Sequence, residues 1–202
     1  MVNIFYNKTT LNDTLIINLH FANANKVENH NNYSLMWSDD KLVGINIFNA
    51  SQHINLEEGF LYCDSTLIAF IKKITNLDLS ANVEKNFVVG KVLKCSKVEN
   101  THLNYCEVDV KDKILNIICG ANNVKENIKV VVANVNTVLP SGKKIVKSKI
   151  QGYESSGMLC SNSELNLASE QKSGIIILEN EYQTGDLFVD VFANKINYGI
   201  KN

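Results

Sequence analysis

The segment 105–119, Tyr105-Cys-Glu-Val-Asp-Val-Lys-Asp-Lys-Ile-Leu-Asn-Ile-Ile-Cys119, has the pattern of a β-hairpin. Residues 105–110 alternate between apolar and polar side chains, as a strand with one buried face does. Residues 114–119 form a second apolar run, and the charged turn Lys111-Asp-Lys113 connects the two runs. We therefore predict two antiparallel strands that bury one common face.

Further short strands are predicted on both sides of this hairpin. Apolar, β-branched runs occur at 87–95, 128–133, 144–150, 174–178 and 187–191. The only proline lies in Leu139-Pro-Ser-Gly142, which predicts a turn. Several short strands without a long helix favour a small closed β-barrel. The OB type is the natural candidate, because its strand face and loops form a platform for oligonucleotides.

A region of mixed helix and strand precedes the barrel. Apolar runs predict strands at 2–6 and 14–19, and a hairpin made of 33–37 and 42–48. Asp64 can cap a helix whose apolar residues recur at helical spacing: Leu67, Ile68, Phe70, Ile71 and Ile74. The predicted fold class is mainly β with an α+β leader. A small α+β domain occupies 1–83, and an OB-fold five-stranded β-barrel with extra C-terminal strands occupies 84–202.

The composition is that of an ordinary globular protein, with 202 residues, 45% apolar residues and 20% charged residues. No apolar run approaches the roughly 18 residues of a membrane helix. The N-terminus also lacks the pattern of a secretion signal, so we expect a cytoplasmic protein without membrane contacts. Five dispersed cysteines and four histidines lack the spacing of metal ligands, so neither a metal nor another cofactor is expected.

A basic stripe precedes a loop rich in glycine and serine. Residues 125–149 hold six lysines against a single acidic residue, Glu126, although a solvated lysine face would have the same charge. The loop that follows is Gly152-Tyr-Glu-Ser-Ser-Gly-Met-Leu-Cys-Ser161. Lysines attract a polyanion, glycine permits close backbone approach, and hydroxyl and N–H groups bind phosphate oxygens. The pattern therefore predicts a nucleic-acid site.

Four blocks, in one order, resemble the EMAP-type tRNA-binding domain: Phe87-Val-Val-Gly-Lys-Val92, Ile118-Cys-Gly-Ala-Asn-Asn-Val124, Leu139-Pro-Ser-Gly142 and Glu154-Ser-Ser-Gly-Met-Leu-Cys-Ser-Asn-Ser-Glu-Leu165. This OB-fold module is found near the start of the bacterial phenylalanyl-tRNA synthetase β chain. Two N-terminal blocks, Phe5-Tyr-Asn-Lys8 and Asn46-Ile-Phe-Asn-Ala-Ser51, resemble the leader domain of the YtpR family of tRNA-binding proteins. The resemblance thus covers essentially the whole chain.

The resemblance implies a non-catalytic protein that binds tRNA through phosphate, 2′-hydroxyl and shape contacts on the barrel. The candidate RNA-binding residues are Lys91, Asn122, Asn123, Lys143, Lys144, Lys149, Ser155, Ser156, Gly157, Met158 and Ser161. DNA is not an expected partner, whereas barrels of this type sometimes form homodimers. Gln151 stands where the family often has an arginine, so lysines must supply the charge as point charges.

Catalytic interpretations fit the loop poorly. Residues 152–157 lack the Gly-x-Ser-x-Gly spacing of a nucleophile elbow, and Cys160 has no histidine near it in sequence.

Other interpretations of the same residues stay open. Asn122 and Asn123 suit left-handed turn positions, Met158 suits a core gap, and Tyr153 could stack on an unpaired base or be an ordinary surface tyrosine. The barrel could instead be a protein-interaction or chaperone-like module, with an exposed apolar patch formed by Leu139, Met158 and Leu159. A third possibility is an assembly subunit whose acidic first domain docks on a synthetase or ribosome.

Overall fold

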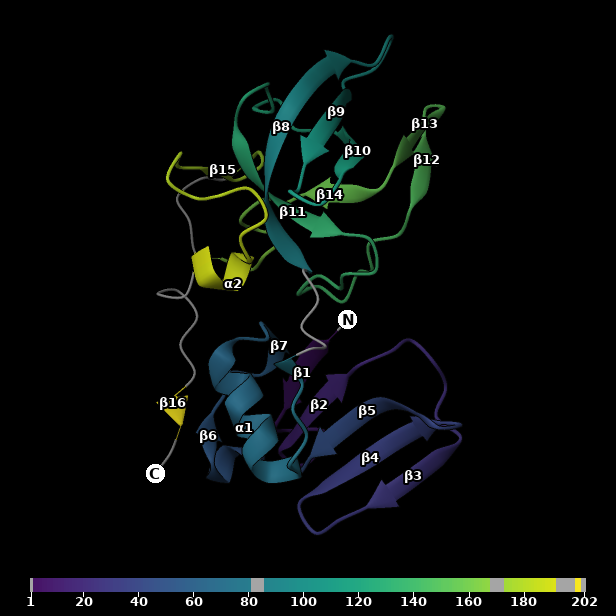
Figure 1. Cartoon of the computed structure of the whole chain (residues 1–202), viewed down its shortest axis with the longest axis vertical. Coiled ribbons are helices and arrows are strands. Elements are labelled where there is room, and N and C mark those ends of the chain that lie inside the picture. Colours follow the sequence, from purple (N-terminus) through teal and green to yellow (C-terminus); the bar gives the residue numbers. More distant parts are fainter. Residues whose placement is uncertain (1, 81–85, 168–172, 192–198, 201–202) are drawn as a thin grey trace. The chain divides into compact units, whose positions relative to one another are not determined.

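In the computed structural model the chain divides into two units, each with its own hydrophobic core (Figure 1). The first unit comprises residues 1–84 with 192–202, and the second comprises residues 85–191. The structure describes residues 2–80, 86–167, 173–191 and 199–200. Strands predominate over helices in these described parts of the chain, so the fold is mainly β.

Among its described residues, the first unit contains a six-stranded antiparallel sheet in the order β3-β4-β5-β2-β1-β7. Its strands are β1 (Asn3–Asn7), β2 (Thr14–Asn18), β3 (Lys26–Asn29), β4 (Tyr33–Ser38), β5 (Lys41–Ile47) and β7 (Gly59–Leu61). The strands predicted near 2–6, 14–19, 33–37 and 42–48 are present as β1, β2, β4 and β5. The one-turn helix η1 (Ala50–Gln52) precedes β6 (Ile54–Asn55), which does not join this sheet.

Helix α1 (Ser65–Thr75) begins after Asp64, as the sequence predicts. The N–H of Leu67 donates to Asp64 Oδ1 at 2.8 Å, which satisfies one of the free donors at the helix start. Leu67, Phe70 and Ile71 are buried in the core of the first unit. The helix ends at Asn76, whose φ of 60° is the left-handed conformation typical of a helix terminus.

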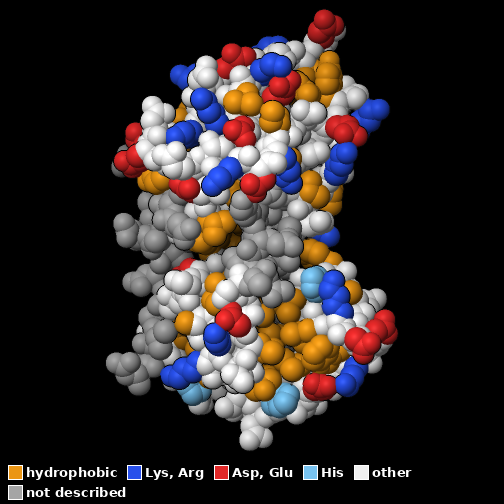
Figure 2. Space-filling view, in the orientation of Figure 1, with side chains coloured by type: hydrophobic (Ala, Val, Ile, Leu, Met, Phe, Trp, Pro, Cys, Tyr) orange, Lys and Arg blue, Asp and Glu red, His pale blue; other side chains and the backbone are white. Residues whose placement is uncertain are grey.

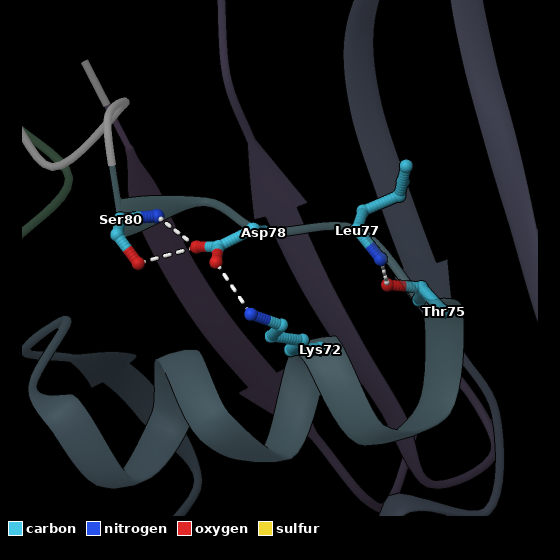
Figure 3. A network of polar contacts seen from close by, with 5 residues as sticks. All are labelled: Lys72, Thr75, Leu77, Asp78 and Ser80. Atoms are coloured by element: carbon cyan, nitrogen blue, oxygen red, sulfur yellow. Dashed lines mark hydrogen bonds and ion pairs between the residues drawn. The ribbon is translucent and has the colours of Figure 1, made fainter.

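Polar contacts direct the chain as it leaves α1 (Figure 3). The N–H of Leu77 donates to Thr75 Oγ at 3.2 Å. Asp78 accepts hydrogen bonds from the N–H and the hydroxyl of Ser80, and its other carboxylate oxygen pairs with Lys72 Nζ at 2.6 Å. These contacts fold the segment 77–80 back over the last turn of the helix, as Figure 3 shows.

The second unit is built on a sheet in the order β10-β9-β8-β11-β14, and β15 pairs with β11 beside it. The strands are β8 (Phe87–Lys97), β9 (Asn104–Asp109), β10 (Ile114–Cys119), β11 (Lys129–Asn134), β14 (Gly157–Leu159) and β15 (Ile177–Leu178). The predicted hairpin at 105–119 is confirmed as β9 and β10, and its inward-facing residues Cys106, Val108, Leu115 and Ile117 are buried. β12 (Ser148–Ile150) and β13 (Tyr153–Ser155) form a separate two-stranded ribbon.

Of the strands predicted for the second unit, one prediction is wrong and another strand is shorter than predicted. The segment predicted as a strand at 187–191 contains helix α2 (Phe188–Val191), in which Phe188 is buried and its ring lies 5.8 Å from that of Phe87. A short apolar run buries its side chains equally well as a strand or as a helical turn, so its pattern does not distinguish them. The strand predicted at 144–150 is reduced to β12, and Lys144 forms only an isolated bridge with Val138.

The last described residues of the chain pair with a strand of the first unit. Gly199–Ile200 forms β16, which pairs antiparallel with β6 of the first unit. A pairing between residues about 145 positions apart has no local sequence pattern, because it depends on an edge strand made elsewhere in the chain.

Ser155 and Ser156 connect the two edges of the second sheet. The N–H of Ser156 donates to the carbonyl oxygen of Asn116 on β10 at 2.8 Å. The N–H of Ile118 donates to Ser155 Oγ at 3.1 Å, and Ser155 is only 3% exposed. The chain then enters β14 at Gly157, where a Cβ atom would lie 3.1 Å from the carbonyl oxygen of Ala133. The segment leading into β14 thus satisfies backbone groups of β10 on the side facing away from β9.

The substitution Ser155→Ala is expected to destabilise the second unit. It removes the acceptor of the Ile118 N–H at a buried position, which costs about 1–3 kcal/mol in the free energy of unfolding. Urea denaturation followed by circular dichroism measures this loss, and hydrogen exchange should be faster at the Ile118 amide.

Ser156→Ala is the matched control, because Ser156 contacts β10 through its backbone N–H and not through its hydroxyl. Its free energy of unfolding should stay within about 0.5 kcal/mol of the wild type. Equal stability of Ser155→Ala and Ser156→Ala would show that the hydroxyl does not hold the two edges together.

Candidate nucleic-acid interface

Three of the four lysines of the predicted site lie in the long connection between β11 and β14. The predicted turn at 139–142 is present, with the N–H of Gly142 donating to the carbonyl oxygen of Leu139 at 2.8 Å. Lys143 follows this turn and is exposed, as is Lys149 within β12, whereas Lys144 is half-buried. All three lysines lie in the segment 143–154 of this connection.

Few acidic residues lie near these lysines in the sequence. Lys147 Nζ lies 2.9 Å from Glu154 Oε2, but both side chains are mostly exposed, and such pairs contribute little stability. Glu154 is the only acidic residue between positions 143 and 154. Figure 2 shows lysine, acidic and hydrophobic side chains interspersed over the face of the second unit in view. The basic character is thus a local property of the segment 143–154.

The connection contains a tight hairpin formed by β12 and β13. Ile150 pairs with Tyr153, and Lys149 pairs with Glu154. The two turn residues Gln151 and Gly152 have φ values of 50° and 87°. Positive φ at both central positions is the property of type I′ turns, whose twist matches that of the flanking strands. The hairpin therefore presents Ile150 and Tyr153 together on one face, since directly paired residues share a face.

Four residues predicted to contact RNA have partners within the protein. Ser155 binds Ile118, and Gly157 allows close approach to β11 as described above. The N–H and the hydroxyl of Ser161 both donate to Glu164 Oε2 at 2.7 Å, and the N–H of Glu164 donates to Ser161 Oγ at 3.3 Å. This reciprocal arrangement is a capping box, and the Ser-x-x-Glu spacing at 161–164 is the sequence signal that would have identified it.

Asn123 is the fourth residue with internal partners. Its Nδ2 donates to the carbonyl oxygen of Ile175 at 2.9 Å, and its Oδ1 accepts the Ile175 N–H at 3.0 Å. The side chain thus replaces a strand in pairing with the segment before β15. Gly174 makes this contact possible, because its φ is 89° and a Cβ atom there would lie 2.6 Å from Asn123 Oδ1.

The other predicted residues offer side chains at the surface, but not all in one place. Asn122 is exposed, while Ser156 and Met158 are half-buried. Met158 of β14 pairs with Ala133, which in turn pairs with Phe87 of β8. Lys91 lies four residues further along β8, which corresponds to about 13 Å of strand. It is also in register with Asp109, so its charge is partly offset.

The apolar patch proposed from the sequence is not at the surface. Leu139 and Leu159 are both buried, and only Met158 is partly accessible. The large apolar side chains that are exposed in this region are Val146, Ile150 and Tyr153. The patch prediction is wrong because Leu159 alternates inward on β14 and Leu139 packs beneath its turn.

The buried thiols of the second unit have little nucleophilic character. Burial raises the pKa of Cys160, Cys106 and Cys119, so the protonated thiol is the stable form near neutral pH. Cys95 and Cys106 face each other across β8 and β9 with their sulfur atoms 3.9 Å apart. Within the described residues, no three His, Cys, Asp or Glu side chains are placed to hold a metal ion. No helix in the described parts of the chain has the length and apolarity to span a membrane.

Comparison with known proteins places the chain in a family. Residues 87–187 match the family model described as "Putative tRNA binding domain". The chain is 36% identical to "Putative tRNA-binding protein YtpR" of Bacillus subtilis, over 93% of this chain and 99% of that protein. It is also 36% identical to "Uncharacterized protein MG449" of Mycoplasma genitalium, over 96% of this chain and 90% of that protein.

A further relative matches only the part of the chain that contains the binding domain. The phenylalanine–tRNA ligase beta subunit of Wolbachia is 46% identical over 104 residues, which are 50% of this chain but 13% of that protein. The similarity to the ligase subunit is therefore that of one module within a much longer protein. Residues 87–187 match the family's tRNA-binding domain, and the chain belongs to the YtpR family.

Proposed function

We propose that this protein binds tRNA and catalyses no reaction. The observation that carries the proposal is the basic connection 143–154, which lies inside the segment that matches the tRNA-binding family. The Bacillus subtilis relative, which matches over 99% of its length, is named for tRNA binding. The match covers only 13% of the ligase subunit. It therefore supports a shared binding module and gives no support for a shared catalytic activity. We expect the protein to act in the cytoplasm, with tRNA as its partner.

The second unit is proposed to be an OB-type barrel. Along the chain its main strands are β8, β9, β10, β11 and β14, which we number one to five. Across the sheet they lie in the order three, two, one, four, five. The hydrogen bonds of Ser155 and Ser156 connect the third strand to the entry of the fifth. This is the connectivity of a partly open, five-stranded Greek-key barrel. We propose that it folds as a domain separate from the first unit.

The strand order also supports the location of the binding site. OB folds bind oligonucleotides on the face of their second and third strands and on the loops after the first and fourth strands. Lys143, Lys144 and Lys149 all lie in the loop between the fourth and fifth strands. The chain contains no arginine, so phosphate contacts would be made by lysine point charges and backbone N–H groups.

The eleven predicted residues are proposed to divide into two groups. Asn123, Ser155, Gly157 and Ser161 have internal partners or close backbone contacts, so they shape the loops. The other seven residues, whose side chains are exposed or half-buried, are proposed to contact RNA: Lys91, Asn122, Lys143, Lys144, Lys149, Ser156 and Met158. Recognition by charge, 2′-hydroxyl groups and shape follows from this set, and it favours RNA over DNA.

Binding to tRNA is expected to weaken steeply with salt. Each phosphate contacted releases counterions, so the logarithm of the affinity falls with the logarithm of salt concentration by roughly 0.7–0.9 per contact. The four lysines Lys91, Lys143, Lys144 and Lys149 therefore predict a slope of about −3 to −4. Fluorescence anisotropy with labelled total tRNA measures the slope when the salt concentration is raised about fourfold, from roughly 50 to 200 mM. A flat response would contradict the proposal.

Replacing Lys143 or Lys149 by alanine is expected to weaken binding of all tRNA species alike. Each exposed lysine that contacts a phosphate contributes about one unit to the salt slope, and its loss should reduce the slope by about that amount. The measurement is the same titration performed with several purified tRNAs.

Lys41→Ala is the control, because Lys41 is an exposed lysine in the first unit, at the start of β5. It removes the same charge from the chain but should leave the affinity unchanged. If Lys41→Ala weakens binding as much as Lys143→Ala does, net charge and not the connection 143–154 governs the interaction.

A further inference from the structure

The β12–β13 hairpin and the residues just before it expose apolar side chains that a surface loop does not need. Val146, Ile150 and Tyr153 are 57%, 36% and 45% exposed, and all lie within eight residues of one another. Clustered exposed apolar side chains on a soluble domain often mark an interaction site. Lys144, Lys147 and Lys149 lie in the same segment of the chain, so apolar and cationic side chains are close to one another in the sequence.

Tyr153 is held in a defined position. Its ring centroid lies 5.5 Å from that of Tyr105 on β9, with the planes tilted by 48°. Tyr105 is in register with Ile118, whose N–H donates to Ser155 Oγ two residues beyond Tyr153. The hairpin is therefore anchored to β10 directly beside the pair of rings. Because the ring is already held in place, less conformational entropy is lost when a ligand binds to it.

Lysines offset the carboxylates that lie next to the two rings. β9 carries Glu107 and Asp109 as well as Tyr105; Glu107 pairs with Lys94 Nζ at 3.1 Å, and Asp109 is in register with Lys91. The connection that carries Tyr153 also holds the exposed lysines Lys143 and Lys149. A phosphate backbone is attracted to these lysines, which brings the bases attached to it near the rings.

From this arrangement we infer that Tyr153, supported by Tyr105, stacks on an unpaired base of the bound RNA. This inference rests on the proposed RNA-binding function. It specifies that the ligand presents at least one unstacked nucleotide, as a loop does and a continuous duplex does not. Every base has a π face, so such stacking is tolerant of sequence. Lys149 neutralises a neighbouring phosphate while the ring of Tyr153 holds the base.

The test compares Tyr153→Ala with Tyr153→Phe in the full-length protein. The probes are total tRNA, a synthetic RNA hairpin with a seven-nucleotide loop (about the size of a tRNA loop), and a blunt RNA duplex of the same stem. Tyr153→Ala should lower the affinity for tRNA and the hairpin by about 5- to 150-fold, with the salt slope unchanged. Tyr153→Phe keeps the ring and should bind within about twofold of the wild type. The duplex should not distinguish the variants.

A tryptophan at the same position gives a direct reading of stacking. The chain has one native tryptophan, Trp37, which lies in the first unit. Tyr153→Trp should show fluorescence quenching when the RNA hairpin is added, whereas the wild-type protein with Trp37 alone should not. Tyr182→Ala, at another half-exposed tyrosine of the second unit, is the control for loss of a surface ring.

The outcomes separate this inference from the function on which it depends. If the wild type binds tRNA with the expected salt dependence and Tyr153→Ala binds equally well, the stacking role is overturned while tRNA binding stands. If the wild type binds no RNA, both are overturned. If Tyr153→Ala retains full RNA affinity but loses a protein partner that survives nuclease treatment, the hairpin is a protein-binding surface and the inference is wrong.

Discussion

The hydrogen bond from the Ile118 N–H to Ser155 Oγ, with its neighbour from the Ser156 N–H to Asn116, connects elements that the chain places far apart. Without these bonds the outer edge of β10 would leave backbone groups without partners on a mostly buried surface. A serine serves here because its short hydroxyl can accept from the edge strand while the backbone continues into β14. The next residue, Gly157, permits the close approach to β11 that follows.

The same junction also determines where the candidate RNA-binding groups lie. Because Ser155 ends β13, its bond to β10 places the whole β12–β13 hairpin against the sheet. Lys149 and Tyr153 are carried on that hairpin, so their directions follow from a buried contact two to six residues away. A loop that is anchored at its base and exposed at its tip can present charge and an aromatic ring without reordering on binding.

Local patterns predicted the elements whose form depends on nearby residues. The hairpin at 105–119 follows from apolar alternation, and α1 follows from Asp64 and the helical spacing after it. Patterns failed where distant contacts decide. Phe188 became helical because a single turn buries its ring near Phe87, and Gly199–Ile200 joined β6 of the first unit. The same holds for the candidate site: its segment was predicted, but the internal hydrogen bonds of Asn123, Ser155 and Ser161 were not.

The sequence by itself determined the family, the mainly β class and the presence of a basic loop followed by a glycine-serine block. These properties depend on residue types and spacing, which are written in the chain. Only the tertiary structure decided which polar groups are used internally. Ser155 binds a residue 37 positions away, and Asn123 binds one 52 positions away. Periodicity reports which side of a local backbone is buried, whereas the partner of a hydroxyl or an amide is known only once folding has brought distant backbone beside it.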